Sequence, residues 1–196
     1  ADRLDGKATE YYENGKRLSE VDYKDGFANG YFQSYYKNGV TKTEGWYVDG
    51  QVEGEWKTYF VNGKLANRTY FAGGTVQGWQ EYFTPLGRKE KELFYQFDFL
   101  NKAIYYDSIG RVSDRIELEH GDGDYVLHFT DEKIKYKASI LNGRYEGKAT
   151  SYNFDGTIIQ EGNFENDDRQ GEWKTNFENG KPDHVFNYSD DELTGT

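Results

Sequence analysis

The side chains that most often carry acid–base or metal chemistry are few in this sequence. The chain has 196 residues, no cysteine and three histidines in separate segments, His120, His128 and His184. No phosphate-binding loop, dinucleotide fingerprint, nucleophile elbow or zinc-protease motif surrounds them. Ordinary surface or stacking positions are therefore the better interpretation of the three histidines. We expect no catalytic residue, no metal site and no cofactor.

Carboxylates are the abundant titratable groups, with 35 acidic residues against 24 basic ones. A glycosidase needs two of them, but carboxylates spread along a sheet usually serve solubility and prevent edge-to-edge pairing. The segment 120–124, His-Gly-Asp-Gly-Asp, lacks the spacing that fills a calcium coordination shell. A turn between strands is the better interpretation of that segment. The sequence therefore predicts a protein that is not an enzyme.

The net charge of −11 limits the classes of partner. Nucleic acids and anionic membrane surfaces both require clustered Lys and Arg, so neither is expected. No apolar run approaches the ~18 residues of a membrane span, and membrane insertion is not expected. A basic protein or a neutral ligand, such as a glycan, is compatible with this charge.

The chain contains no Met and opens on Ala1, which suggests a trimmed, mature product of an exported precursor. An extracytoplasmic location, in the periplasm or at the cell surface, is therefore the favoured expectation. A fragment of a cytoplasmic protein is the alternative.

An internal repeat of about 24 residues organises the whole sequence. Segments 54–64 and 171–181 are identical at nine of eleven positions. Such a period is the signature of a repeat array, here residues 1–196 as a single array with an irregular segment at 110–137. The repeats start near residues 6, 30, 54, 78, 101, 123, 147 and 171.

Each repeat reads as a β-hairpin. Tyr, Phe, Thr and Val, which suit pleated strands, flank an Asn-Gly pair. Asn-Gly favours a type I′ turn, in which both central residues have positive φ; the pairs begin at Asn14, Asn38, Asn62 and Asn179. No helical period of useful length occurs. We predict an all-β fold, an elongated single-layer antiparallel meander or solenoid of about eight hairpins.

Aromatic residues make up 18% of the chain against 35% for all hydrophobic residues, so rings rather than aliphatic side chains must hold the sheet together. Seventeen residues after each repeat start, every position is apolar, as in Tyr47 and Phe71. If the turn fixes the register, each such ring lies opposite the glycine that starts its repeat, and can cover its bare backbone.

The pattern Gly-x-x-x-x-Tyr-Tyr-x-Asn-Gly, as in 6–15 and 30–39, resembles MORN-type repeats. The resemblance is closest to the bacterial variant found in exported and antitoxin-like proteins, and it covers nearly the whole chain. It implies a twisted single-layer sheet with a role in protein interaction or assembly. It implies no catalytic residues.

Three functions are compatible with these features. The first is a non-catalytic scaffold for protein–protein interaction, as a component of a cell-envelope assembly. The second is an antitoxin or immunity protein, whose negative charge would speed encounter with a basic toxin. The third is a glycan- or choline-binding module, since the aromatic rings of other hairpin repeats cage cations or stack on sugars.

A binding surface is predicted where the repeats differ from one another. Sixteen residues after the repeat start most repeats are polar, but the second to fourth carry Trp46, Tyr70 and Phe94. We expect two cross-strand pairs there, Tyr31 with Trp46 and Trp79 with Phe94. Alternation along the strands adds Tyr35, Tyr59 and Phe83 to the same face. The rings would form a contiguous exposed interaction patch, or a local core covered by the curl of the sheet.

Overall fold

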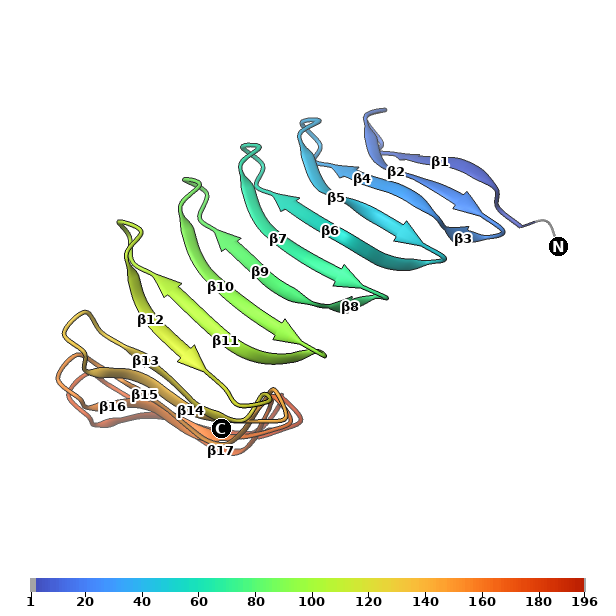
Figure 1. Ribbon diagram of the computed structural model, residues 1–196. Helices are drawn as coiled ribbons and strands as arrows, with labels where there is room; N and C mark the ends of the chain where they lie inside the picture. The colour runs from blue at the N-terminus through green and yellow to red at the C-terminus, as the bar shows by residue number, and fades with distance from the viewer. Residues whose placement is uncertain (1–2, 196) are drawn as a thin grey trace. The chain divides into compact units, whose positions relative to one another are not determined.

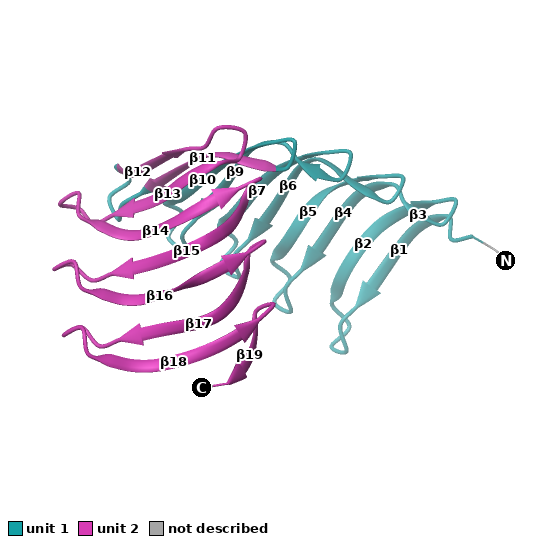
Figure 2. Ribbon diagram, turned by 90° about the horizontal axis from the view of Figure 1, so that it is seen from below, with its two compact units in different colours: residues 1–98, 106–111 teal, residues 99–105, 112–196 magenta. Residues whose placement is uncertain are grey.

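The computed structural model describes residues 3–195 as an all-β protein with 19 strands. The strands form two antiparallel sheets of 12 and 7 strands, and within the described residues no helix is long and apolar enough to cross a membrane. The chain divides into two compact units (Figure 2): unit 1, residues 1–98 and 106–111, and unit 2, residues 99–105 and 112–196. The predicted antiparallel hairpin meander is confirmed.

Unit 1 contains one open layer of strands that follow one another in chain order (Figure 1), β1-β2-β4-β5-β6-β7-β9-β10, with the two-residue β3 on β2 and β8 on β7. Their bounds are β1 (Gly6–Tyr11), β2 (Arg17–Lys24), β3 (Phe27–Ala28), β4 (Gly30–Tyr35), β5 (Thr41–Val48), β6 (Gln51–Tyr59), β7 (Leu65–Ala72), β8 (Thr75–Val76), β9 (Gly78–Phe83) and β10 (Lys89–Gln96).

Unit 2 contains a seven-stranded sheet in strict chain order, β13 to β19. Its strands are β13 (Gly123–His128), β14 (Ile134–Leu141), β15 (Arg144–Tyr152), β16 (Ile158–Glu165), β17 (Asp168–Asn176), β18 (Pro182–Ser189) and β19 (Glu192–Gly195). Most of β11 (Phe99–Tyr106) and all of β12 (Val112–Glu117) also belong to this unit.

The irregular segment predicted at 110–137 is where the ladder changes. Within unit 2, β12 and β13 belong to different sheets and meet at an isolated bridge between Glu119 and Asp122. A tight turn lies inside that bridge, with positive φ at His120 and Gly121. The run 120–124 thus begins with a turn between strands, as the sequence indicated, and its last two residues, Gly123 and Asp124, are the start of β13.

The Asn-Gly turns have a different geometry from the one predicted. In the turn at 36–40, the N–H of Tyr36 donates to the Val40 carbonyl and the N–H of Gly39 to the Tyr36 carbonyl, both at 2.8 Å. Gly39 has φ +91°, but Asn38 lies outside the positive-φ region. This is a type I turn followed by a glycine bulge. The prediction of positive φ is therefore wrong at the asparagines, Asn14, Asn38, Asn62 and Asn179.

The side chain of the asparagine accounts for this choice. The Asn38 Oδ1 accepts the N–H of Val40 at 3.1 Å, an Asx-type bond that stabilises the ordinary turn conformation. Type I′ turns occur instead at the connections between repeats, as at Asp49-Gly50, with φ +49° and +83°. The N–H of Gly50 donates to the Ala28 carbonyl at 2.8 Å, so this connection is bonded to the one before it.

The cross-strand register is the one that the repeat predicts. Gly30 lies opposite Tyr47, and Gly54 opposite Phe71. The expectation that these rings cover the starting glycines is wrong at Gly54, where no heavy atom lies within 4 Å of the place that a Cβ would take. A ring does cover Gly45, against which the Trp56 indole packs.

Trp56 holds a bulge in the ladder between β5 and β6. The register shifts between Glu44 and Trp46, and the indole N–H of Trp56 donates to the Trp46 carbonyl at 3.1 Å. A Cβ on Gly45 would lie 2.3 Å from the Trp56 ring. Unit 2 repeats this arrangement, since the Trp173 indole lies on Gly162.

Replacing Gly45 with Ala should lower the free energy of unfolding by about 2 kcal/mol or more, because the Trp56 ring and the bulge must move. Gly195→Ala is the matched control, because Gly195 has no positive φ and open space at its Cβ position. It should change stability by less than about 0.5 kcal/mol. Equal melting temperatures of the two variants would contradict the packing of Trp56 on Gly45.

Replacing Gly39 with Val should destabilise the chain more than replacing Lys37 with Ala. A β-branched residue strongly resists the positive φ that Gly39 adopts, at a cost of about 1–2 kcal/mol. Thermal melts followed by circular dichroism compare the two variants. A Gly39→Val protein that melts at the same temperature as the Lys37→Ala protein would rule out the glycine bulge.

Candidate functional site

One face of the unit 1 sheet presents an unusual series of exposed rings. We call it the Trp46 face; it carries the side chains of Trp46 and of the residues that alternate with it or lie opposite it. The opposite face, here the Trp56 face, carries Phe32, Tyr47, Trp56 and Phe71, whose rings pack in series with centroids 5.0–6.5 Å apart. The core of unit 1 is therefore on the Trp56 face.

The predicted cross-strand ring pairs both form on the Trp46 face. Tyr31 lies opposite Trp46 with ring centroids 5.4 Å apart, and Trp79 lies opposite Phe94 at 5.1 Å. The exposed fractions are 54% for Trp46 and 53% for Tyr70, 41% for Trp79 and 37% for Tyr31. These rings are not a covered core.

The other predicted residues of this surface are half-buried, namely Tyr35, Tyr59, Phe83 and Phe94. The rings also do not form one unbroken patch. Glu53 lies opposite Trp46, and Glu55 opposite Tyr70, so acidic side chains separate the two ring pairs. The Trp46 face is thus a mixed aromatic and acidic surface.

Glu44 is the carboxylate that organises the half of the Trp46 face around Trp46. The hydroxyls of Tyr31 and Tyr59 donate to its two oxygens at 2.8 and 2.6 Å. Among the described residues, no ammonium or guanidinium lies within 4 Å of it. Burial and the bond to Glu44 raise the pKa of Tyr31 to about 12 and also raise the pKa of Tyr59. The phenols therefore remain neutral donors, and the charge of Glu44 stays uncompensated by any cation of unit 1.

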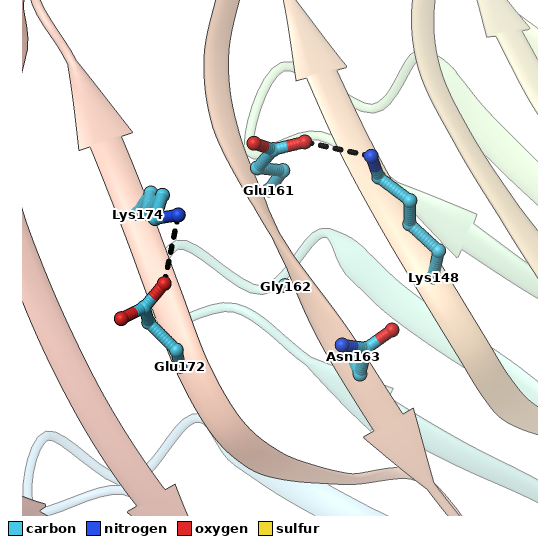
Figure 3. Close-up of a pocket in the computed structure, with 6 residues that line it drawn as sticks. All are labelled: Lys148, Glu161, Gly162, Asn163, Glu172 and Lys174. Carbon is cyan, nitrogen blue, oxygen red and sulfur yellow. Dashed lines mark ion pairs between the residues drawn. The ribbon is translucent and has the colours of Figure 1, made fainter.

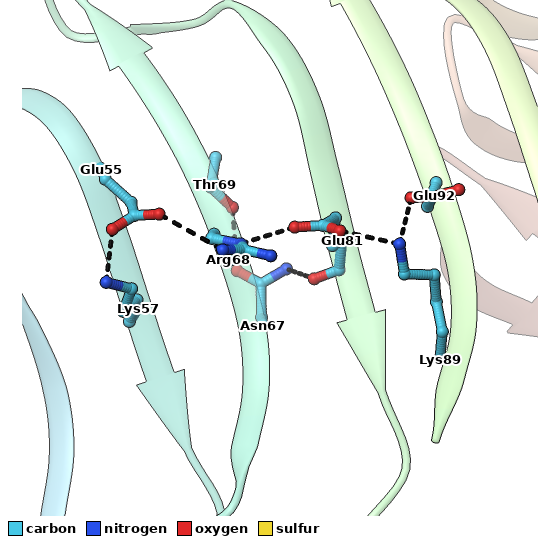
Figure 4. A network of polar contacts seen from close by, with 8 residues as sticks. All are labelled: Glu55, Lys57, Asn67, Arg68, Thr69, Glu81, Lys89 and Glu92. Carbon is cyan, nitrogen blue, oxygen red and sulfur yellow. Dashed lines mark hydrogen bonds and ion pairs between the residues drawn. The ribbon is translucent and has the colours of Figure 1, made fainter. Parts of the chain in front are cut away.

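Three other carboxylates of the Trp46 face, Glu55, Glu81 and Glu92, are paired with cations of the same face, in contrast to Glu44. Figure 4 shows the network, in which Arg68 contacts Glu55 at 3.6 Å and Glu81 at 2.5 Å. Lys57 pairs with Glu55, and Lys89 pairs with Glu81 and Glu92. Three cations thus balance three carboxylates. Tight pairing explains why the pKa of Glu81 lies below its usual range despite burial, through bonds from Lys89 and Arg68.

The histidines do not assemble into a catalytic or metal site. His128 contacts the Asp114 carboxylate at 2.9 Å, His184 contacts Asp183 at 2.9 Å and stacks on Phe186, and His120 lies in a turn. Within residues 3–195, no group of three or more His, Cys, Asp or Glu side chains could hold a metal ion.

Sequence reasoning missed two residues that hold the backbone at Trp46 in place, Trp56 and Gly45. A signal for them exists. Gly45 and Gly162 lie outside the repeating glycine positions, and each is followed eleven residues later by a tryptophan, Trp56 and Trp173. Sequence reasoning also missed Glu44, because its lack of a cationic partner depends on side-chain conformations that no spacing reveals.

The described chain therefore belongs to the class of open β-hairpin repeat proteins. Four hairpins match the family model described as MORN repeat variant, at residues 4–25, 52–72, 145–166 and 169–190. The chain therefore contains MORN-type repeats, as the resemblance predicted. MORN repeats in general are non-enzymatic modules, and they bind proteins or membranes. A comparison with curated proteins yields no match.

Alkaline pH should destabilise unit 1 between about pH 10 and pH 12. Tyr31 has a raised folded pKa of about 12, and the pKa values of Tyr35 and Tyr59 are also raised. The stabilisation that goes with a raised pKa is complete below the unfolded value of about 10 and is lost as the pH rises toward the folded value. The strand signal in circular dichroism should fall together with the rise of phenolate absorbance. Full phenolate formation below pH 11 with an intact strand signal would contradict this assignment.

Proposed function

We propose that this protein is a non-catalytic scaffold that binds a protein partner through the Trp46 face of unit 1, within an extracytoplasmic assembly of the cell envelope. The observation that carries the proposal is the exposure of Trp46, Tyr70 and Trp79 on one face. Large exposed rings cost solubility, and they commonly mark interaction sites. Trp and Tyr are also the residues that most often dominate interface energies.

The comparison with unit 2 supports this location. The residues that correspond to Trp46 in the last two repeats are Asn163 and Asn187. By contrast, the residues that correspond to Tyr47, on the opposite face, are still aromatic there, Phe164 and Tyr188. The fold therefore does not need rings at the Trp46 position. Their presence in unit 1 is better explained by recognition than by folding.

A second candidate function is that of an antitoxin or immunity protein. The net charge of −11 favours fast association with a basic protein. Glu44 and Glu53 add to this, since neither forms an ion pair among the described residues. Such a partner would be a single tightly bound basic toxin, whereas a scaffold would retain several envelope proteins.

The double variant Trp46→Ser, Tyr70→Ser tests the proposal. Immobilised wild-type protein and variant are compared by quantitative mass spectrometry after incubation with an extract of the source organism. The variant should lose the proteins that the wild type retains by roughly tenfold or more, at an unchanged melting temperature.

The matched control is Asn163→Ser, Asn187→Ser, which changes the same column in unit 2. It should retain the same proteins as the wild type. Equal retention by all three proteins would exclude the Trp46 face as the binding surface. A collapsed fold of the first variant would assign the rings to the core instead.

A further inference from the structure

The Trp46 face contains a shallow hollow whose lining differs in kind from that of its counterpart in unit 2. The hollow has a volume of about 350 Å³ and is lined by Tyr31, Glu44, Gly45, Trp46, Glu55 and Lys57. Its floor is the strand bulge, which the Trp56 indole fixes from the opposite face through its bond to the Trp46 carbonyl. The hollow is therefore a product of the repeat fold rather than of a chance side-chain conformation.

Unit 2 forms the same hollow at positions that are each 117 residues later. It has a volume of about 260 Å³. Figure 3 shows the residues that line it, Lys148, Glu161, Gly162, Asn163, Glu172 and Lys174. Its floor is fixed in the same way, by the Trp173 indole N–H donating to the Asn163 carbonyl at 3.1 Å. The two hollows are thus a natural comparison, in which the backbone is shared and the lining differs.

The hollow in unit 2 is neutral. Lys148 pairs with Glu161 at 2.8 Å, and Lys174 pairs with Glu172 at 2.8 Å. The residue that corresponds to Glu53 is Gln170, which is uncharged. Every carboxylate that lines this hollow therefore has its own cation within the unit.

The hollow in unit 1 lacks one of these cations. Lys57 pairs with Glu55, as Lys174 does with Glu172. Tyr31 replaces Lys148, however, and its hydroxyl gives Glu44 a hydrogen bond but no positive charge. Trp46 replaces Asn163 and places an exposed indole beside that carboxylate.

We propose that the hollow at Trp46 binds an arginine side chain of the protein partner, which supplies the positive charge that Lys148 supplies in unit 2. This inference rests on the proposed function and specifies the chemistry of its partner. A guanidinium stacks on an indole and at the same time donates to a carboxylate, which an ammonium does less well. Trp46 provides the ring, Glu44 the carboxylate, and Glu53 adds negative charge across the strand.

The rest of the Trp46 face indicates what accompanies that arginine. The pair Trp79–Phe94 is flanked by Glu81 and Glu92, which Lys89 already neutralises. Three strand spacings separate β5 from β9, or roughly 14 Å. The partner segment therefore presents an arginine at one end and an apolar side chain at the other.

N-acetyl-L-arginine methylamide is the probe for this site, and it needs no knowledge of the partner. Its binding is followed by the indole N–H resonances of the four tryptophans in two-dimensional NMR spectra of the full chain. The Trp46 resonance should shift saturably at millimolar probe, and the Trp173 resonance should not. The corresponding citrulline derivative, which has nearly the same shape without the charge, should bind roughly tenfold or more weakly.

Two variants test the role of Glu44. Tyr31→Lys places at this hollow the residue that unit 2 has, and it leaves the Trp46 resonance as the reporter. It should weaken binding of the arginine derivative roughly tenfold or more, because the new ammonium pairs with Glu44. Glu44→Gln should have a similar effect, and it serves if the first variant does not fold.

The outcomes separate this inference from the proposed function. No saturable shift at Trp46, equal binding of the citrulline derivative, or unchanged binding by both variants would each overturn the arginine site. The retention of partner proteins by the wild type and its loss with Trp46→Ser, Tyr70→Ser would then still stand. Conversely, arginine binding at Trp46 with no protein retained through this face would leave the site intact and remove the scaffold function.

Discussion

The contact between the Trp56 indole and the bare backbone of Gly45 is the interaction on which the architecture of unit 1 depends. The ring occupies the space of a missing side chain, and its N–H satisfies the Trp46 carbonyl at the bulge. A single-layer sheet has no second layer to bury its faces, so rings that lie along the sheet must provide its core. Unit 2 uses Trp173 on Gly162 for the same purpose.

Hydrogen bonds at both ends of the strands link one hairpin to the next. At the end with the connections between repeats, the N–H of Gly50 donates to the Ala28 carbonyl of the preceding connection. At the end with the hairpin turns, the hydroxyl of Tyr36 donates to the Tyr59 carbonyl of the following repeat at 2.6 Å. A hairpin alone is only marginally stable in water, so these bonds give each repeat a stability that it lacks by itself. Gly50 and Tyr36, which form these bonds, therefore serve the folding of the array.

The periodicity of the sequence was sufficient to predict the hairpins, their register and the cross-strand ring pairs, because a fixed period determines which residues lie opposite each other. Turn geometry could not be predicted in this way. An Asn-Gly pair fits a type I′ turn as well as a type I turn with a glycine bulge. The choice depends on the Asx bond, in which the Val40 N–H donates to the Asn38 Oδ1. Whether the Trp46 face was core or surface was equally undetermined, because alternation places rings such as Phe32 and Tyr31 on both faces of β4.

The near-identity of the segments 54–64 and 171–181 has a consequence for how the chain reaches its native state. Each segment contains a tryptophan that packs on a glycine of the preceding strand, Trp56 on Gly45 and Trp173 on Gly162, and the two packing sites are alike. We therefore expect that, during refolding, each segment can also pack on the other segment's glycine, which would form the bulge between the wrong strands. Such misassembly is a characteristic failure of repeat proteins. The few positions that differ, such as Tyr59 against Asn176, would then favour the correct pairing, because Tyr59 donates its hydroxyl to Glu44 and Asn176 has no hydroxyl to donate there.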